Sequence, residues 1–122
     1  MDLAQALLDI LDGLPAVTEL GTIRPVILVA ETGGPARSSA APPHLIEGDF
    51  QLDVYAETKP AANDLAWDAH SRILAAPRDQ PSTITVNHTR ITPPTWVPDD
   101  DWPVDGRPGP RYLLTGNLKG HV

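Results

Sequence analysis

A chain of 122 residues is long enough to bury one hydrophobic core without a metal ion or a disulfide. Its formal net charge of -7 argues against binding to the phosphates of nucleic acid or to an anionic membrane surface, because both attract concentrated Lys and Arg. The absence of Cys excludes disulfides, thiolate catalysis and Cys-based zinc sites.

The N-terminal stretch MDLAQALLDILDGLP predicts a helix over residues 2–12. Asp2 can cap its first turn, and Gly13 and Pro15 follow as stop signals. Acidic residues stand where a signal peptide carries basic ones, and no apolar run has the length of a membrane span, so we expect a soluble protein that is not exported. The apolar residues that share one helix face are Leu3, Ala6, Leu7, Ile10 and either Leu11 or Leu14.

Two strands are predicted next. Residues 25–30, PVILVA, form a nearly continuous apolar run, which is typical of a strand buried on both faces or inside a sheet. Residues 49–57 alternate between apolar and polar side chains, the period of a strand with one buried face. Between them, residues 31–47 contain Gly-Gly-Pro and Pro-Pro and predict a long loop, either a flexible arm or a partner-binding loop.

A second helix is predicted from Thr58 or Lys59, either of which can cap it, to Ala76, where Pro77 ends it. Its apolar stripe can cover the apolar face of the strand at residues 49–57, so this unit is the predicted core. The stripe consists of Ala62, Leu65, Ala66, Ala69 and Ile73, and Leu74 and Ala76 are expected to widen it.

The last two predicted strands are residues 82–92 and 111–119, with Gly116 as a bulge or kink in the second. Residues 93–110 contain six Pro and are predicted to form neither helix nor strand. The fold class is therefore α+β: one domain over residues 1–122, with a two-layer, mostly antiparallel four-stranded sheet, both helices on one face and long Pro-rich loops.

The search for chemistry finds no catalytic, cofactor or metal site. The four His, at positions 44, 70, 88 and 121, lack the spacing of metal ligands, and Asp99, Asp100 and Asp101 do not match a calcium loop. We therefore expect a solvated acidic loop. One alternative from another class stays open: a small cytoplasmic enzyme or ligand-binding domain, in which His88, Arg90 and the three Asp converge on a pocket.

Two tryptophans lie in the Pro-rich segment, at Trp96 and Trp102. Large aromatic side chains on a loop are enriched where partners bury them. The other interpretation is that they fold back over the open face of their own sheet. Both interpretations remain open at the level of sequence.

The stretch from Phe50 to Ala76, FQLDVYAETKPAANDLAWDAHSRILAA, resembles the tail terminator (tail completion) proteins of long-tailed bacteriophages. The resemblance lies in the strand motif LDVYA, the polar turn from Glu57 to Pro60, and an Ala-rich helix with a Leu-Ala step at Leu65. The segment 93–110 departs from that pattern.

This resemblance implies a structural protein of the virion without turnover and without a cofactor. Such proteins are assembled in the host cytoplasm into a ring, usually of six copies, that caps the tail tube at the tail-neck junction, stops its polymerisation and offers the surface that joins the head. Genomic DNA passes through the ring without specific binding, which suits a negatively charged lumen. Another head-tail connector or neck protein is the nearest alternative.

The expected partners are further copies of the chain, the tail tube protein and the neck proteins, with no membrane. The loops 31–47 and 93–110 are expected to point away from the sheet toward these partners, so deletion of residues 95–107 is expected to spare the ring and abolish head joining. The candidate interface residues are Tyr55, Trp96, Asp99, Asp100, Asp101, Trp102 and Arg111.

Overall fold

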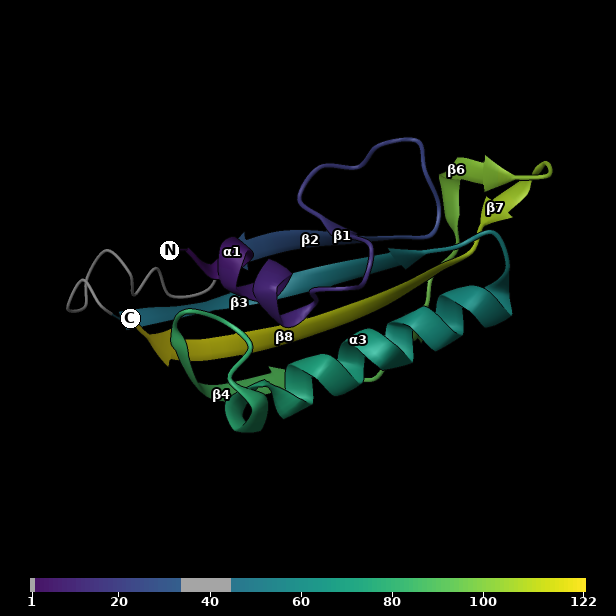
Figure 1. Cartoon of the computed structure of the whole chain (residues 1–122). Coiled ribbons are helices and arrows are strands. Elements are labelled where there is room, and N and C mark those ends of the chain that lie inside the picture. The colour runs from purple at the N-terminus through teal and green to yellow at the C-terminus, as the bar shows by residue number, and fades with distance from the viewer. Residues whose placement is uncertain (1, 34–44) are drawn as a thin grey trace.

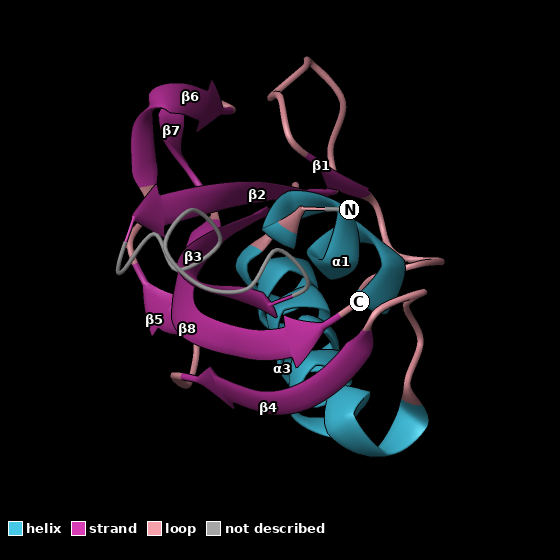
Figure 2. Cartoon of the chain, turned by 90° about the vertical axis from the view of Figure 1, so that its left-hand side faces the viewer, coloured by secondary structure: helices cyan, strands magenta, loops and turns pink. Residues whose placement is uncertain are grey.

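Six strands form one mostly antiparallel sheet, and two helices lie on one of its faces, in a computed structural model that describes residues 2–33 and 45–122 (Figures 1 and 2). The sheet order is β1-β2-β3-β8-β4, and β5 also pairs with β8. A separate hairpin is made of β6 and β7. The elements are α1 (Leu3–Ile10), β1 (Ala16–Val17), β2 (Val26–Gly33), β3 (Leu45–Tyr55), α3 (Lys59–Asp79), β4 (Thr85–Ile91), β5 (Thr95–Trp96), β6 (Asp99–Val104), β7 (Arg107–Gly109) and β8 (Arg111–His121).

The α+β class and the mostly antiparallel sheet are confirmed, but the prediction of four strands is wrong. The two extra strands are short. β1 pairs in parallel with β2 through Ala16 and Val17, and β5 pairs with β8 through Thr95 and Trp96. Two-residue strands carry no period-two pattern long enough to read in a sequence, which is why they were missed.

The central strands are β3 and β8, which pair in antiparallel register from Leu45 and His121 at one end to Tyr55 and Arg111 at the other. The predicted alternation of β3 is confirmed, because its apolar side chains point into the core. α1 packs over β2 and β3, whereas α3 packs mainly over β4 and β8 (Figure 2). The fully buried core therefore includes Leu7, Ile10, Ile27, Phe50, Leu52, Val54, Ala62, Ala66, Ala69, Ile73, Leu114 and Leu118.

Both helix starts are as predicted. The carboxylate of Asp2 accepts a hydrogen bond from the backbone N–H of Gln5 at 2.8 Å. Thr58 is the cap of α3, and its hydroxyl accepts from the N–H of Ala61 at 3.3 Å. Each cap satisfies a backbone donor that the first turn of a helix leaves free.

The prediction that Pro77 ends the second helix is wrong, because α3 continues to Asp79 with Pro77 inside it. Pro77 has no N–H to donate to the carbonyl of Ile73. The hydroxyl of Thr89 on β4 donates to that carbonyl instead, at 2.7 Å. Gln80 then ends the helix in a left-handed conformation, and its side-chain amide donates to the carbonyls of Pro77 and Val86.

Both predicted loops need correction. In the segment 31–47, residues 31–33 extend β2 and residues 45–47 begin β3, while residues 34–44 lie outside the described residues. The segment 93–110 contains β5, β6 and β7 and is not a loop. Its prolines are tolerated because β6 and β7 pair only at Asp99 with Gly109 and at Val104 with Arg107, which leaves Pro103 and Pro108 outside the paired positions.

Gly116 is neither a bulge nor a kink, because it pairs in regular register with Phe50 on one side and Ile91 on the other. The irregularity in this part of the sheet lies in β4, between Val86 and His88. A Cβ atom at Gly116 would lie 2.6 Å from Cζ of the fully buried Phe50 and even closer to the carbonyl oxygen of Arg90. Glycine is required here by close approach.

The variant Gly116→Ala is expected to lose about 1–3 kcal/mol of unfolding free energy, because its methyl group must displace a buried ring or the β4 backbone. Urea unfolding followed by fluorescence measures the change. Gly21→Ala is the matched control, since a Cβ atom there meets nothing within 4 Å. Equal midpoints for the two variants would contradict the close approach.

Candidate functional site: the β6–β7 hairpin and its anchor

The hairpin of β6 and β7 rises from one end of the sheet (Figure 1). Asp105 and Gly106 form its turn, both with positive φ, 51° and 75°. This combination belongs to the two-residue hairpin turns that favour Asp-Gly. A Cβ atom at Gly109 would collide with the carbonyl of Trp102, so β7 can approach β6 closely only because Gly109 has no side chain.

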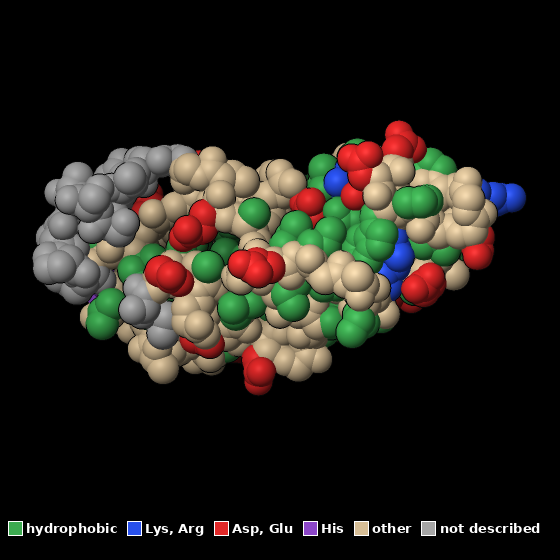
Figure 3. All heavy atoms as spheres, turned by 90° about the horizontal axis from the view of Figure 1, so that it is seen from above, with side chains coloured by type: hydrophobic (Ala, Val, Ile, Leu, Met, Phe, Trp, Pro, Cys, Tyr) green, Lys and Arg blue, Asp and Glu red, His purple; other side chains and the backbone are tan. Residues whose placement is uncertain are grey.

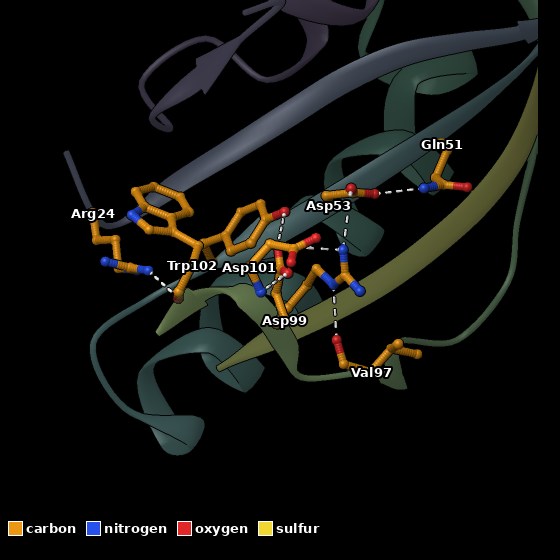
Figure 4. A network of polar contacts seen from close by, with 9 residues as sticks. Arg24, Gln51, Asp53, Val97, Asp99, Asp101 and Trp102 are labelled. Atoms are coloured by element: carbon orange, nitrogen blue, oxygen red, sulfur yellow. Dashed lines mark hydrogen bonds and ion pairs between the residues drawn. The ribbon is translucent and has the colours of Figure 1, made fainter. Parts of the chain in front are cut away.

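Trp102 anchors the hairpin to the sheet (Figure 4). Its ring lies edge-on to the ring of Tyr55, with centroids 4.8 Å apart, and the guanidinium carbon of Arg24 lies 3.6 Å from its centroid. A nitrogen of the same guanidinium also donates to the carbonyl oxygen of Trp102. Aromatic and cation–π contacts of this kind each stabilise by roughly 0.5–2 kcal/mol.

A polar network fixes the base of the hairpin beside this ring contact (Figure 4). The hydroxyl of Tyr55 donates to a carboxylate oxygen of Asp99 at 3.0 Å. The guanidinium of Arg111 donates to the carbonyl of Val97 at 2.8 Å and lies 3.6 Å from Asp99 and 3.9 Å from Asp53. The side chains of Arg111 and both Asp residues are at most 21% exposed, so the pairing is shielded from water.

The three consecutive Asp residues divide into two groups. Asp99 faces the body, and its second carboxylate oxygen accepts from the backbone N–H of Asp101 at 2.9 Å. The side chains of Asp100 and Asp101 are exposed. The prediction of a solvated acidic loop therefore applies to Asp100 and Asp101 but is wrong for Asp99, which pairs with Arg111.

The two tryptophans have different environments. Trp102 folds back over its own sheet, where its ring packs against Tyr55. For Trp102, therefore, the second of the two interpretations applies. Trp96 pairs with Tyr112 across the sheet edge, with ring centroids 5.2 Å apart, and remains 38% exposed. The ammonium of Lys59 lies 4.5 Å from the ring of Trp96. A hollow of about 510 Å³ separates Trp96 and the start of α3 from Pro108 on the hairpin.

The residues of the predicted alternative pocket do not meet. His88 and Arg90 lie beside Lys119 and Asn117 near the end of β8, whereas Asp99 contacts Arg111 at its beginning. From Lys119 to Arg111 a strand spans about 26 Å.

The other two described His residues have separate contacts. His70 contacts the ring of Trp67, the imidazole of His121 is hydrogen-bonded to Asn87, and His44 lies outside the described residues. Within residues 2–33 and 45–122, no group of three His, Asp or Glu side chains is placed to hold a metal ion.

The structure thus gathers Tyr55, Asp99, Trp102 and Arg111 into one anchor, which brings together four of the seven candidate interface residues. Sequence reasoning missed Arg24, whose partner is far away in the chain. It also missed the turn, although the Asp-Gly pair at 105–106 is a strong local signal for a hairpin.

No protein-family model and no curated protein matches this chain. Neither described helix is both long and apolar enough to cross a membrane.

Burial raises the pKa of Tyr55, with Asp99 and Asp53 adding to the effect and Arg111 opposing it. We expect the unfolding free energy to fall as the pH rises above about 10, because unfolded Tyr55 then releases a proton that the folded protein still holds. Below that pH both the folded and the unfolded state hold the proton, and the full contribution of Tyr55 to the unfolding free energy is present.

Urea unfolding of the wild type and of Tyr55→Phe between about pH 8 and pH 11 tests this expectation. The Phe variant cannot ionise at this position, so the stability difference between the two proteins should shrink as the pH rises. Parallel declines in both proteins would contradict it. Tyr112 is present in both and cancels in the comparison.

Proposed function

We propose that this chain is a tail terminator of a long-tailed bacteriophage, which forms a ring on the tip of the tail tube, stops the tube growing and provides the surface for head joining. The strand–turn–helix unit that carries the resemblance supports this function. That unit, β3 with α3, is central to the fold: β3 pairs with two strands along its length, and the cap at Thr58 begins the helix that covers β4 and β8.

The single observation that best supports ring assembly is that the sheet has two different, largely free edges. In the part of the chain that the structure describes, β1 pairs only with Ile27 and Leu28, so β2 is open beyond them, and no strand pairs with the outer edge of β4. Free strand edges are sites of pairing between chains. Two unlike edges favour head-to-tail contacts, which close into rings when the rotation permits.

The hairpin suits the role of a docking surface for a tube or neck protein. The anchor of Trp102, Tyr55 and Arg24 holds it before any partner arrives, so binding costs little ordering of the chain. Asp100 and Asp101 are exposed on it and give the partner a negatively charged contact. The acidic chain as a whole lets DNA pass through a ring without adhering to it.

The proposed ring predicts a solution species of six times the 13.1 kDa chain mass, measured by light scattering after size exclusion, and a ring with an open centre in negative-stain images. Added to polymerising tail tube protein from the same genome, the purified chain should shorten the tubes, with rings at their tips. Tubes of unchanged length without bound protein would overturn the terminator function, and binding to a head connector instead would favour another neck protein.

Charge reversal on the hairpin should separate joining from assembly. Asp100→Lys is expected to reduce the joining of phage heads to tails in an in vitro assembly assay by about tenfold or more. The ring mass should stay unchanged, because the side chain is exposed and outside the anchor. Asp12→Lys, at an exposed position two residues beyond α1, changes the net charge equally and is the matched control. Equal joining by both variants would remove the hairpin from the joining surface. Deletion of 95–107 is unsuitable, since it removes β5 and Trp102.

A further inference from the structure

Four of the large hydrophobic side chains that the structure exposes form two pairs. Leu20 and Ile23, 42% and 77% exposed, lie on the segment of residues 18–24 between β1 and β2, called here the apolar loop. Trp67 and Leu74, 45% and 52% exposed, lie seven positions apart on α3 and therefore share one face of the helix, called here the α3 stripe. Leaving such side chains in water forfeits the free energy of their burial.

The two patches belong to opposite ends of the sheet order. The apolar loop connects β1 to β2 and lies beyond that edge, while α3 packs on β4 and β8 at the other edge (Figures 1 and 2). Each patch is therefore out of reach of the other within one copy. Two separate, unlike patches on one chain are the arrangement that a head-to-tail contact requires.

The two sides differ in charge, although exposed Asp64, Asp68 and Asp79 lie among the basic residues of α3. Among the described residues, the exposed Lys and Arg side chains lie on α3, β4 and β8, apart from Arg107 on the hairpin. The side with the apolar loop carries exposed Glu19 and Glu31 and the acidic hairpin. Figure 3, viewed from that side, shows acidic side chains spread over the surface, hydrophobic ones near the hairpin, and few basic ones.

We propose that the apolar loop of one copy packs onto the α3 stripe of the next copy, with Ile23 against Trp67 and Leu74. Burial of an aromatic anchor by aliphatic side chains is the usual energetic centre of a protein interface. Exposed Arg72 and Arg78 on α3, which lie 3.8 Å from Asp68 and 2.8 Å from Asp79 in their own chain, then face the acidic side of the neighbour. This contact rests on the proposed ring, for which it names the two surfaces that join the subunits.

The proposal can be tested with two variants that each block one surface. Ile23→Asp and Trp67→Asp place a charge in the centre of either patch, and both native side chains are exposed, so the folded monomer should persist, as circular dichroism can verify. Each variant alone is expected to dissociate, with a midpoint concentration raised by about 30-fold or more. Val122→Asp, at a 69% exposed position outside both patches, is the control that should keep the wild-type mass.

Mixing the two variants decides the geometry. Ile23→Asp retains an intact α3 stripe and Trp67→Asp an intact apolar loop, so the mixture should form a dimer of one copy of each and grow no further. No dimer on mixing would overturn the head-to-tail contact. If both variants still form rings of the wild-type mass, the contact between the apolar loop and the α3 stripe is also overturned, but the proposed ring stands.

The remaining outcomes separate this contact from the proposed function. A wild-type chain that stays monomeric at every concentration would overturn the proposed contact, because the contact would then not hold two copies together. Rings that obey the mixing test but never shorten tail tubes would support the contact and contradict the terminator function.

Discussion

The pairing of β3 with β8 is the constraint on which the rest of this structure depends. The two strands are the longest in the sheet and pair from end to end. β2 and β1 extend the sheet from the free side of β3, while β4 and β5 extend it from the free side of β8. The last pair of this ladder, Tyr55 with Arg111, is also the base on which the hairpin stands, so the core and the candidate site share one element.

The anchor of the hairpin combines apolar and charged contacts that are weak alone. A half-buried charge is costly unless it is paired and hydrogen-bonded, and Asp99 meets that condition through Tyr55, Arg111 and the backbone of Asp101. The ring of Trp102 covers the same spot between Tyr55 and Arg24. The consequence is a projecting element whose base is held by contacts within the chain, while the carboxylates of Asp100 and Asp101 stay exposed.

The proposed function depends on the strand edges that have no partner strand in the part of the chain that the structure describes. Among the described residues, the sheet has two unlike, largely free edges, with an apolar loop beyond one of them and an apolar helix face beside the other, and in the proposed ring these surfaces meet neighbouring copies. The hairpin and the α3 stripe consist of different residues, whereas the apolar loop is joined to the hairpin by the contacts of Arg24 with Trp102.

Local periodicity determined much of this protein: the cap at Asp2, the alternation of β3, and the helix begun at Thr58 were all predicted, because side-chain direction follows backbone geometry within a few residues. What only the tertiary structure decided is which strands meet. The pairing of β3 with β8 and the contact of Arg24 with Trp102 join residues far apart in the chain, and no sequence period encodes them. The Pro-rich segment became strands for the same reason, since β8 and Tyr55 offered partners that local propensity ignores.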